Sequence, residues 1–201
     1  EITTKKDTHI DIDIDIVAVD GQTVNTTQLY YVKFHKPKGY VTAIEDSTHP
    51  VVMDLFPPEY LKMGVVPVGR LDKDTEGLLL LTNDGVWGHS IINGHKHVPK
   101  VYYVEFEGEL SEEGIQRIKE GIVLGDGTQC KPASIELLSA QSATITIEEG
   151  KYHQVKRMIG AAGGVVTYLK RITIGHVDLS GIEKVGSLKD LTIDEVEGFK
   201  K

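Results

Sequence analysis

The sequence predicts an α+β fold, because segments with strand character outnumber the two segments with clear helical spacing. The plainest strand is the run 78–81, which is short, continuously apolar and bounded by turn residues, as in a strand buried on both faces. β-branched and aromatic residues predict further strands at 30–34, 101–106, 165–175 and, as a pair, within 131–147. Helical spacing is clear at 111–120 and 155–162.

The composition is that of a globular protein. The 201 residues, of which 40% are hydrophobic, are enough for one large domain or two small ones. No apolar run approaches the ~20 residues that cross a bilayer, and the charged first residues are unlike a signal peptide. The lone Cys130 cannot form an intramolecular disulfide, which fits a reducing compartment. We therefore expect a cytoplasmic protein without a membrane association.

The charge balance restricts the ways in which the protein can bind a polyanion. The chain has 22 Lys and Arg against 30 Asp and Glu, a net charge of −8. General polyanion binders are usually basic, so non-specific nucleic-acid binding is disfavoured. An RNA enzyme whose cations are confined to one cleft remains compatible with this balance.

The first 29 residues predict a small β structure. Residues 10–16 alternate isoleucine and aspartate, which is typical of a half-buried strand with a wet acidic face. Metal binding by the aspartates of this run (Asp11, Asp13 and Asp15) is the alternative, and a solvated strand face already explains the pattern. Asp20-Gly21 then predicts a tight hairpin turn.

The strand at 30–34 is followed by the sequence His35-Lys36-Pro37-Lys38-Gly39. Proline fixes φ and glycine allows a reversed turn, so we expect Lys36 and Lys38 to be presented on a stiff loop. On sequence alone, however, the charged end of a hairpin is the favoured interpretation of this segment.

The charged loop before the apolar run carries Asp72 and Asp74, with Arg70 before Asp72 and Lys73 between the two carboxylates. A solvated loop with local charge pairs is the simplest interpretation. An EF-hand calcium loop is the second, but its twelfth position is Asn83, which cannot supply a bidentate carboxylate. The third is catalytic, with one carboxylate as nucleophile or base. A glycoside hydrolase is disfavoured, because two carboxylates on one loop rarely straddle a sugar at ~5–10 Å.

The region 86–100 is predicted to be a loop. His95 and His97 lack a partner at metal-ligand spacing, so solvated histidines are favoured over a metal site. In the strand that follows, alternation places Tyr102 on the same face as Val104 and Phe106. Such a tyrosine is usually a core residue.

The two predicted helices differ in character. The first has Ser111 as its N-cap and ends at Gly121, and it carries no chemistry. The second, predicted over 155–162, overlaps the sequence Glu-Gly-Lys-Tyr-His-Gln-Val-Lys-Arg-Met at 149–158, which combines an apolar stripe with a basic face. That face is formed by Lys151, Lys156 and Arg157.

Three separated motifs now occur in one order: Gly-Arg-Leu-Asp-Lys-Asp-Thr-Glu-Gly and the apolar run at 69–85, Lys-Val-Tyr at 100–102, and the 149–158 sequence. Together they resemble the RsuA-type pseudouridine synthases, which modify ribosomal RNA. The resemblance runs from about residue 30 to about 190. It implies the pseudouridine synthase catalytic fold: a mostly antiparallel mixed sheet with flanking helices and a central RNA-binding cleft.

The resemblance also implies a domain organisation. Residues 30–201 would form the catalytic domain, and 1–29 would be the last hairpin and linker of an N-terminal RNA-binding module that resembles a ribosomal protein. In the family, two helices precede this hairpin and carry many of the basic residues. We expect the module to be truncated or partly absent here, without these helices, which would partly explain the acidic charge.

The catalytic roles implied by the resemblance fall on three residues. Asp72 would be the nucleophile, Lys156 the cation that keeps it ionised, and Tyr102 the ring over the target uracil that also removes the proton from carbon five. Burial favours the neutral form of a carboxyl group and a nearby cation opposes this. Asp74 and Thr75 would hold the loop through hydrogen bonds to backbone amides.

The same resemblance implies RNA contacts and a substrate. Arg70 would replace the flipped nucleotide and hold phosphate, and the other expected RNA-binding residues are Lys36, Lys38, Lys100, Lys151 and Arg157. The isomerisation needs no cofactor or metal. The wording of the third motif is similar to that of the small-subunit enzyme, so we expect 16S ribosomal RNA as the substrate. We also expect a monomer. The alternatives are 23S ribosomal RNA, or a non-catalytic, RNA-binding ribosome-assembly factor.

Overall fold

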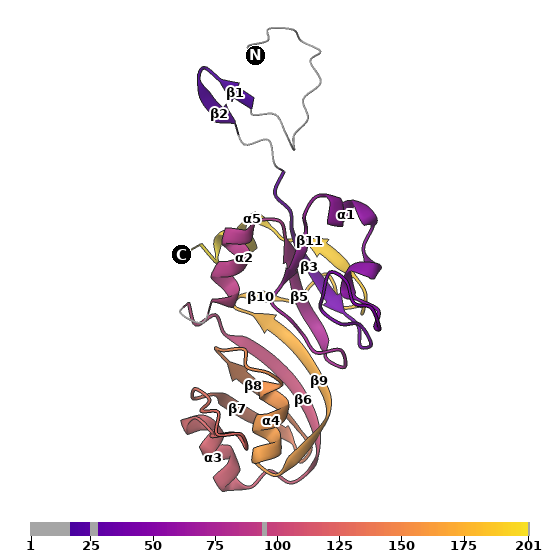
Figure 1. Ribbon diagram of the computed structural model, residues 1–201. Helices are drawn as coiled ribbons and strands as arrows, with labels where there is room; N and C mark the ends of the chain where they lie inside the picture. The colour runs from indigo at the N-terminus through magenta and orange to yellow at the C-terminus, as the bar shows by residue number, and fades with distance from the viewer. Residues whose placement is uncertain (1–16, 25–27, 94–95, 201) are drawn as a thin grey trace.

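A computed structural model describes residues 17–24, 28–93 and 96–200 (Figure 1). The predicted strand 10–16, with its three aspartates, lies outside these residues. The hairpin predicted at Asp20-Gly21 is present: it joins two antiparallel strands, and both turn residues have positive φ, 51° and 77°. These strands are β1 (Val17–Val19) and β2 (Gln22–Val24).

The main sheet has nine strands and confirms the α+β prediction, since it is mixed and mostly antiparallel. Its central order is β11-β3-β5-β9-β6-β8-β7, with β4 on β5 and β10 on β9 (Figure 1). All described pairs are antiparallel except β5 with β9. The strands are β3 (Tyr31–Lys36), β4 (Val66–Val68), β5 (Glu76–Thr82), β6 (Lys100–Gly108), β7 (Ser134–Ser139), β8 (Ser142–Ile147), β9 (Gly164–Ile174), β10 (Val177–Asp178) and β11 (Leu188–Asp190).

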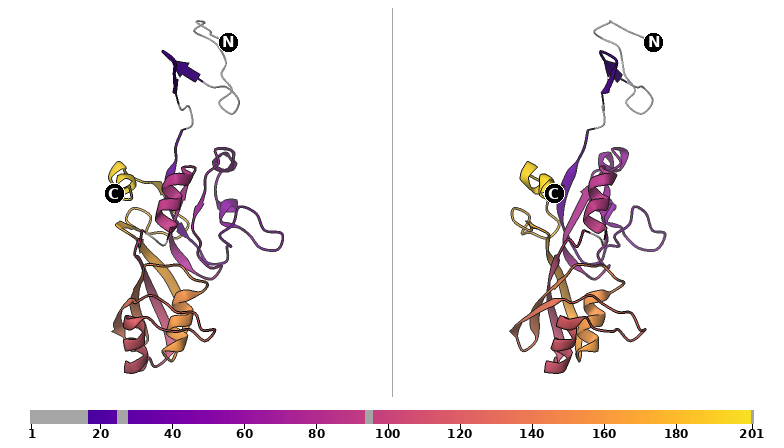
Figure 2. Two further views of the ribbon diagram at one scale, coloured as in Figure 1. Left: turned by 60° about the vertical axis from the view of Figure 1, so that its left-hand side comes forward. Right: turned by 90° about the vertical axis from the view of Figure 1, so that its left-hand side faces the viewer.

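The sheet has two halves: the nucleophile half (β11, β3, β5 and β4), named after the role expected of Asp72, and the lysine half (β9, β10, β6, β8 and β7). In the views of Figure 2 the two halves occupy opposite ends of the main body. They join where β5 runs parallel to β9, through the pairs Glu76↔Lys170 and Gly77↔Arg171. Gly77 is required there, because its φ is +113° and a Cβ would meet the backbone of Arg171.

In the nucleophile half, β5 is the buried strand that the sequence predicts. Its four leucines, Leu78, Leu79, Leu80 and Leu81, are all 0% exposed and alternate between two hydrophobic clusters on the two faces of the sheet. The helices of this half are the 3₁₀ helix η1 (Val52–Leu55), α1 (Pro58–Lys62), α2 (Gly85–Ile92) and α5 (Ile193–Glu197).

In the lysine half, β6 pairs with both β8 and β9, and Tyr102, Val104 and Phe106 face one core cluster as predicted. The helices are α3 (Glu112–Glu120) and α4 (Gln154–Ala161). Ser111 caps α3 by accepting from the amide of Gly114 at 2.9 Å, and Gly121 ends it. Both predicted helices are therefore confirmed.

Three sequence-based expectations about local structure are wrong. Residues 86–92 belong to α2, not to a loop, because the Asp84 side chain accepts from the amide of Trp87 and starts a helix. Strand β3 continues through His35 and Lys36, which were expected in a loop. Helices α1 and α5 were also not expected; each is only five residues long, too short for a periodic apolar pattern. Among the described residues, no helix is long and apolar enough to span a membrane.

Candidate active site

A cleft of about 840 Å³ lies between the loop at 69–75, the start of β6, the turn that precedes α4, and β9. Its lining contains four Asp or Glu and six Lys or Arg, whereas in the whole chain the 30 acidic residues outnumber the 22 Lys and Arg. The cations are Arg70, Lys73, Lys100, Lys151, Lys156 and Arg171. An acidic protein therefore presents one concave surface suited to a polyanion.

Asp72 lies in this cleft with both carboxylate oxygens near a nitrogen. Its Oδ2 is 2.9 Å from Lys156 Nζ, and its Oδ1 is 3.6 Å from His153 Nε2. The side chain is 30% exposed, so it can reach a ligand in the cleft. The ion pair expected between Asp72 and Lys156 is thus present, although 84 positions separate them in the sequence.

Lys36 holds the Asp72 loop from beneath. Its side chain is 0% exposed, and Nζ donates to the carbonyls of Pro37, Asp72 and Thr75 at 3.0, 3.1 and 2.9 Å. The expectation that Lys36 is presented to RNA is therefore wrong: it is the last residue of a buried strand. Burial lowers the pKa of Lys36 to about 8, against the partly opposing charge of Asp74 and Asp72.

A buried threonine fixes the same loop from the other side. Thr42 Oγ1 donates to the carbonyl of Leu71 at 2.8 Å, and the amide of Leu71 donates back to Thr42 Oγ1 at 3.1 Å. The amide of Gly39 also donates to the carbonyl of Lys73 at 2.7 Å. The backbone on both sides of Asp72 is therefore held by groups outside the loop.

Lys156 bridges two carboxylates instead of one. Its Nζ lies 2.6 Å from Asp74 Oδ1 as well as 2.9 Å from Asp72 Oδ2. Burial lowers the pKa of Lys156, but the hydrogen bonds to Asp74 and Asp72 outweigh it, so the pKa is raised overall. Asp74 is 72% exposed, so solvent screens its share of the attraction more than that of Asp72.

The expected role of Thr75 in holding the loop is wrong, whereas the Asp74 carboxylate does accept from a backbone amide, its own, in addition to its main contact with a lysine. The Asp74 side chain pairs with Lys156, and Thr75 Oγ1 is buried without a hydrogen-bond partner among the described residues. Burial raises the pKa of Asp74, but Lys156 more than offsets this and the pKa is lowered. The loop is held by Lys36 and Thr42 instead.

Tyr102 and Arg171 form the floor of the cleft. Tyr102 is 8% exposed and lies opposite Arg171 in the β6–β9 register. Arg171 Nη1 is 3.5 Å from the Tyr102 hydroxyl, Nε donates to the carbonyl of Leu78 at 2.8 Å, and Nη2 has no partner among the described residues. Sequence reasoning missed Arg171; a charged residue within an apolar strand was the available signal.

The other predicted RNA-binding cations differ in how free they are. Arg70 is exposed at the cleft, and Lys38 lies 4.3 Å above the ring of Tyr168. Lys100 is half-buried in the cleft, where burial lowers its pKa, and it donates to the carbonyl of Val98 at 2.9 Å. Lys151 and Arg157 are already paired, with Glu149 at 3.0 Å and Asp126 at 2.5 Å.

The described residues contain no group of three or more His, Cys, Asp or Glu that could hold a metal ion. The EF-hand interpretation also fails on geometry, because the segment after Asp72 and Asp74 is strand β5 and not a helix. His97 pairs with Glu148 at 3.4 Å, and His95 lies outside the described residues.

A mixed sheet thus holds a carboxylate–lysine pair in a cleft that suits a polyanion. These are the features of an enzyme that acts on a nucleic acid. The sequence model of the family described as RNA pseudouridylate synthase matches residues 30–161, more than half of the chain. The chain belongs to this family of RNA pseudouridine synthases, enzymes that isomerise uridine in RNA.

Similar proteins agree with this assignment. A Bacillus subtilis protein named uncharacterized RNA pseudouridine synthase YtzG is 42% identical over 94% of this chain and 80% of its own length. The ribosomal small subunit pseudouridine synthase A is 39% identical in Pasteurella multocida, over 85% of this chain and 74% of that protein. In Escherichia coli it is 36% identical, over 83% and 72%. A solved pseudouridylate synthase matches with a TM-score of 0.79 and 34% identity, over 99% of this chain and 86% of that chain. The family resemblance drawn from the motifs is confirmed.

Proposed function

We propose that this enzyme isomerises one uridine of ribosomal RNA with Asp72 as the nucleophile. The observation that carries the proposal is the Asp72 carboxylate in the cleft, with Oδ2 2.9 Å from Lys156 Nζ. In the reaction the bond between N1 and C1′ breaks, the uracil turns, and a bond between C5 and C1′ forms. C5 loses a proton and N1 gains one, so atoms balance without a co-reactant. Lys156 favours the ionised form of Asp72 that this chemistry needs.

Tyr102 and Arg70 have complementary roles in this proposal. Tyr102, on the cleft floor, supports the target uracil and takes the proton from C5. A stacked base cannot reach Asp72, so the target nucleotide flips into the cleft at a cost of a few kcal/mol. Arg70, exposed at the cleft, fills the space left behind and binds phosphate, and Lys38 and Lys100 add phosphate contacts.

The proposed substrate is 16S RNA of the small ribosomal subunit. Two similar proteins are named for the small subunit, and the third motif has the wording expected for that specificity. The enzyme would act in the cytoplasm as a monomer, without cofactor or metal. Residues 30–201 would form the catalytic domain, and residues 1–29 would belong to an RNA-binding module that adds affinity.

Mapping pseudouridines in ribosomal RNA tests this proposal. Cells that lack the protein should lose one pseudouridine from the small-subunit RNA. Wild type and Asp74→Asn should restore it, and Asp72→Asn should not. Loss of a site only in large-subunit RNA would contradict the target, and an unchanged map with an assembly defect would instead identify a non-catalytic assembly factor.

A further inference from the structure

Tyr152 is an exposed aromatic residue on the wall of the catalytic cleft. Its side chain is 77% exposed, and it is the one aromatic residue among the exposed large hydrophobics of the described chain. By contrast, Tyr102 on the floor of the same cleft is 8% exposed. The mechanism assigned to Asp72, Lys156 and Tyr102 makes no use of Tyr152. Tyrosine is enriched at binding interfaces, so an exposed ring on the wall of this cleft is available to a ligand.

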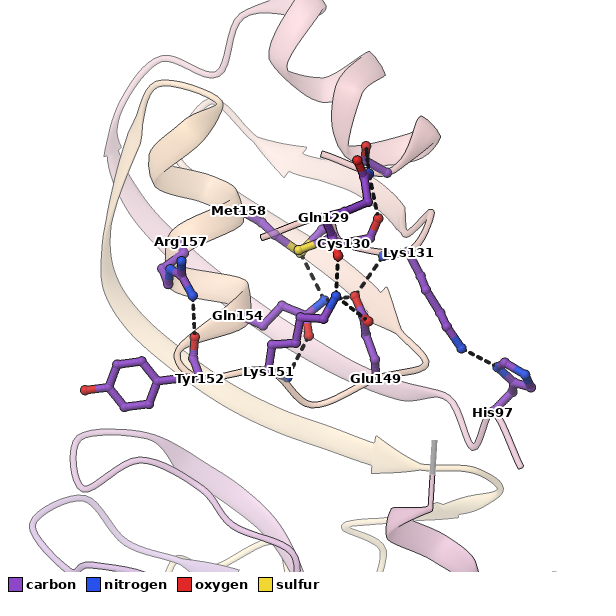
Figure 3. Close-up of polar contacts among 11 residues, drawn as sticks. His97, Gln129, Cys130, Lys131, Glu149, Lys151, Tyr152, Gln154, Arg157 and Met158 are labelled. Carbon is purple, nitrogen blue, oxygen red and sulfur yellow. Dashed lines mark hydrogen bonds and ion pairs between the residues drawn. The ribbon is translucent and has the colours of Figure 1, made fainter. Parts of the chain in front are cut away.

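The turn that carries Tyr152 is held by partly buried polar contacts, which Figure 3 shows. Glu149 Oε1 accepts from the amide of Lys131 at 2.8 Å and from Gln154 Nε2 at 2.7 Å. Gln154 Oε1 in turn accepts from the amide of Lys151 at 2.9 Å. Both Glu149 and Gln154 have little exposed surface, 11% and 4%. The backbone before and after Tyr152 is thus fixed by one connected polar network.

The backbone of Tyr152 itself is also held. Its carbonyl accepts from Arg157 Nη1 at 3.3 Å, and Arg157 Nη2 is paired with Asp126 at 2.5 Å. In Figure 3 the Tyr152 ring extends away from the Glu149–Gln154 network while its carbonyl turns toward Arg157. An aromatic ring that is exposed but preorganised loses little entropy when a ligand binds it.

One face of the ring is covered and connects to the nucleophile. The rings of Tyr152 and His153 stack with centroids 3.8 Å apart and planes 19° apart. His153 Nε2 is 3.6 Å from Asp72 Oδ1, so the stack begins beside the catalytic carboxylate and ends at the exposed ring. Two rings, those of His153 and Tyr152, therefore separate Asp72 from the open face of Tyr152.

We propose that the open face of Tyr152 stacks an unpaired nucleobase of the substrate RNA, one that flanks the target uridine. Aromatic side chains bind bases of single-stranded RNA in this way, and the adjacent cations of the cleft suit the phosphates between the two nucleotides. The flanking base would extend the Tyr152–His153 stack and fix the position of the target. This inference deepens the proposed function and rests on a uridine in RNA as the substrate.

The experiment measures binding to an RNA fragment that contains the uridine modified by the wild-type enzyme, whichever RNA carries it. Failure of the small-subunit proposal therefore leaves this test intact. Tyr152→Ala should raise Kd by about 5- to 150-fold, the range for one lost stack. Tyr152→Phe, which keeps the ring, should stay within about twofold. So should Ile193→Ala, which removes a side chain that is 81% exposed on α5.

A second series removes one base at a time from the fragment at the positions around the target. For the wild-type enzyme, one abasic position should raise Kd by a similar factor, and in Tyr152→Ala the same position should have no effect. Two results would overturn the proposal. One is an unchanged Kd for Tyr152→Ala. The other is an equal penalty at every abasic position in both proteins. If Tyr152→Ala keeps its Kd but loses single-turnover rate at saturating RNA, the first of these results holds, and Tyr152 only supports His153.

Discussion

The two halves of the main sheet bring different groups to the cleft. The nucleophile half supplies Asp72 on a loop that a buried lysine holds, and the lysine half supplies Lys156 from α4 and Tyr102 from β6. Within each half the strands pair antiparallel, but between them β5 and β9 meet along a short parallel register (Figure 1). Neither half contains a complete site. The 2.9 Å between Asp72 and Lys156 therefore depends on a junction far shorter than the strands that it connects.

The junction itself should be the most sensitive position. Gly77→Ala would place a Cβ 2.7 Å from the backbone nitrogen of Arg171 at a φ of +113°, so β5 and β9 would have to separate. We expect a loss of at least about 3 kcal/mol in the free energy of unfolding, measured by urea denaturation. Gly85→Ala is the control, since it meets nothing within 4 Å at the start of a helix. Equal stability of the two variants would contradict the junction's importance.

The charge supplied across the junction should have the next largest effect. Lys156→Met removes the cation beside Asp72, and we expect kcat to fall by about 10²- to 10³-fold. Lys156→Arg keeps a charge and should retain most of this activity. Tritium release from RNA labelled at C5 of uridine measures both rates. A kcat for Lys156→Met equal to that of wild type would show that the ion pair serves structure alone.

Lys36 gives the nucleophile half its own pH dependence. Its folded pKa of about 8 lies below the ordinary 10.5, so the unfolded chain binds more protons between these values. Stability due to Lys36 is therefore complete above about pH 10.5 and is lost as pH falls through about 8. As pH rises from about 8 to about 10.5, wild type should gain about 3 kcal/mol in unfolding free energy relative to Lys36→Met. A difference independent of pH in urea titrations would contradict a buried, easily neutralised lysine.

In the lysine half, the turn before α4 is held by the carboxylate of Glu149. Removing this carboxylate should lower the stability less than the changes above. Glu149→Gln cannot accept from Lys131, Lys151 and Gln154 together, so we expect a loss of about 1–2 kcal/mol in stability. The neighbouring Glu148→Gln, 50% exposed and paired with His97, should change stability by less than about 0.5 kcal/mol. Thermal unfolding of both variants compares them directly. Similar shifts in Tm would argue against the network as the support of α4.

Much of the lysine half could be predicted from local sequence. Its helices carry caps and apolar periodicity, and its strands alternate, so Ser111, Tyr102 and the segment before Gly163 were placed correctly. In the nucleophile half, the helices α1 and α5 are too short to show an apolar periodicity, so they were not predicted. The position of Lys36 was missed for a different reason: a lysine beside a proline resembles a surface loop, and only tertiary contacts with three carbonyls show that it is buried.

The site could be predicted in its pairing but not in its full geometry. The motifs placed Asp72 with Lys156, and that pair is present. The second contact of Lys156 with Asp74, the approach of His153 to Asp72, and Arg171 beneath Tyr102 all depend on how the two halves meet. No spacing within either motif encodes that arrangement.

Comparing Asp72→Asn with Asp74→Asn tests the central claim most directly, since the two carboxylates share one lysine and one loop. The measurement is single-turnover tritium release from RNA labelled at C5 of uridine, at saturating enzyme. We predict no release above background for Asp72→Asn, and a rate within about tenfold of wild type for Asp74→Asn, whose carboxylate is 72% exposed. Normal release by Asp72→Asn, or its loss only in Asp74→Asn, would contradict the assignment of Asp72 as nucleophile.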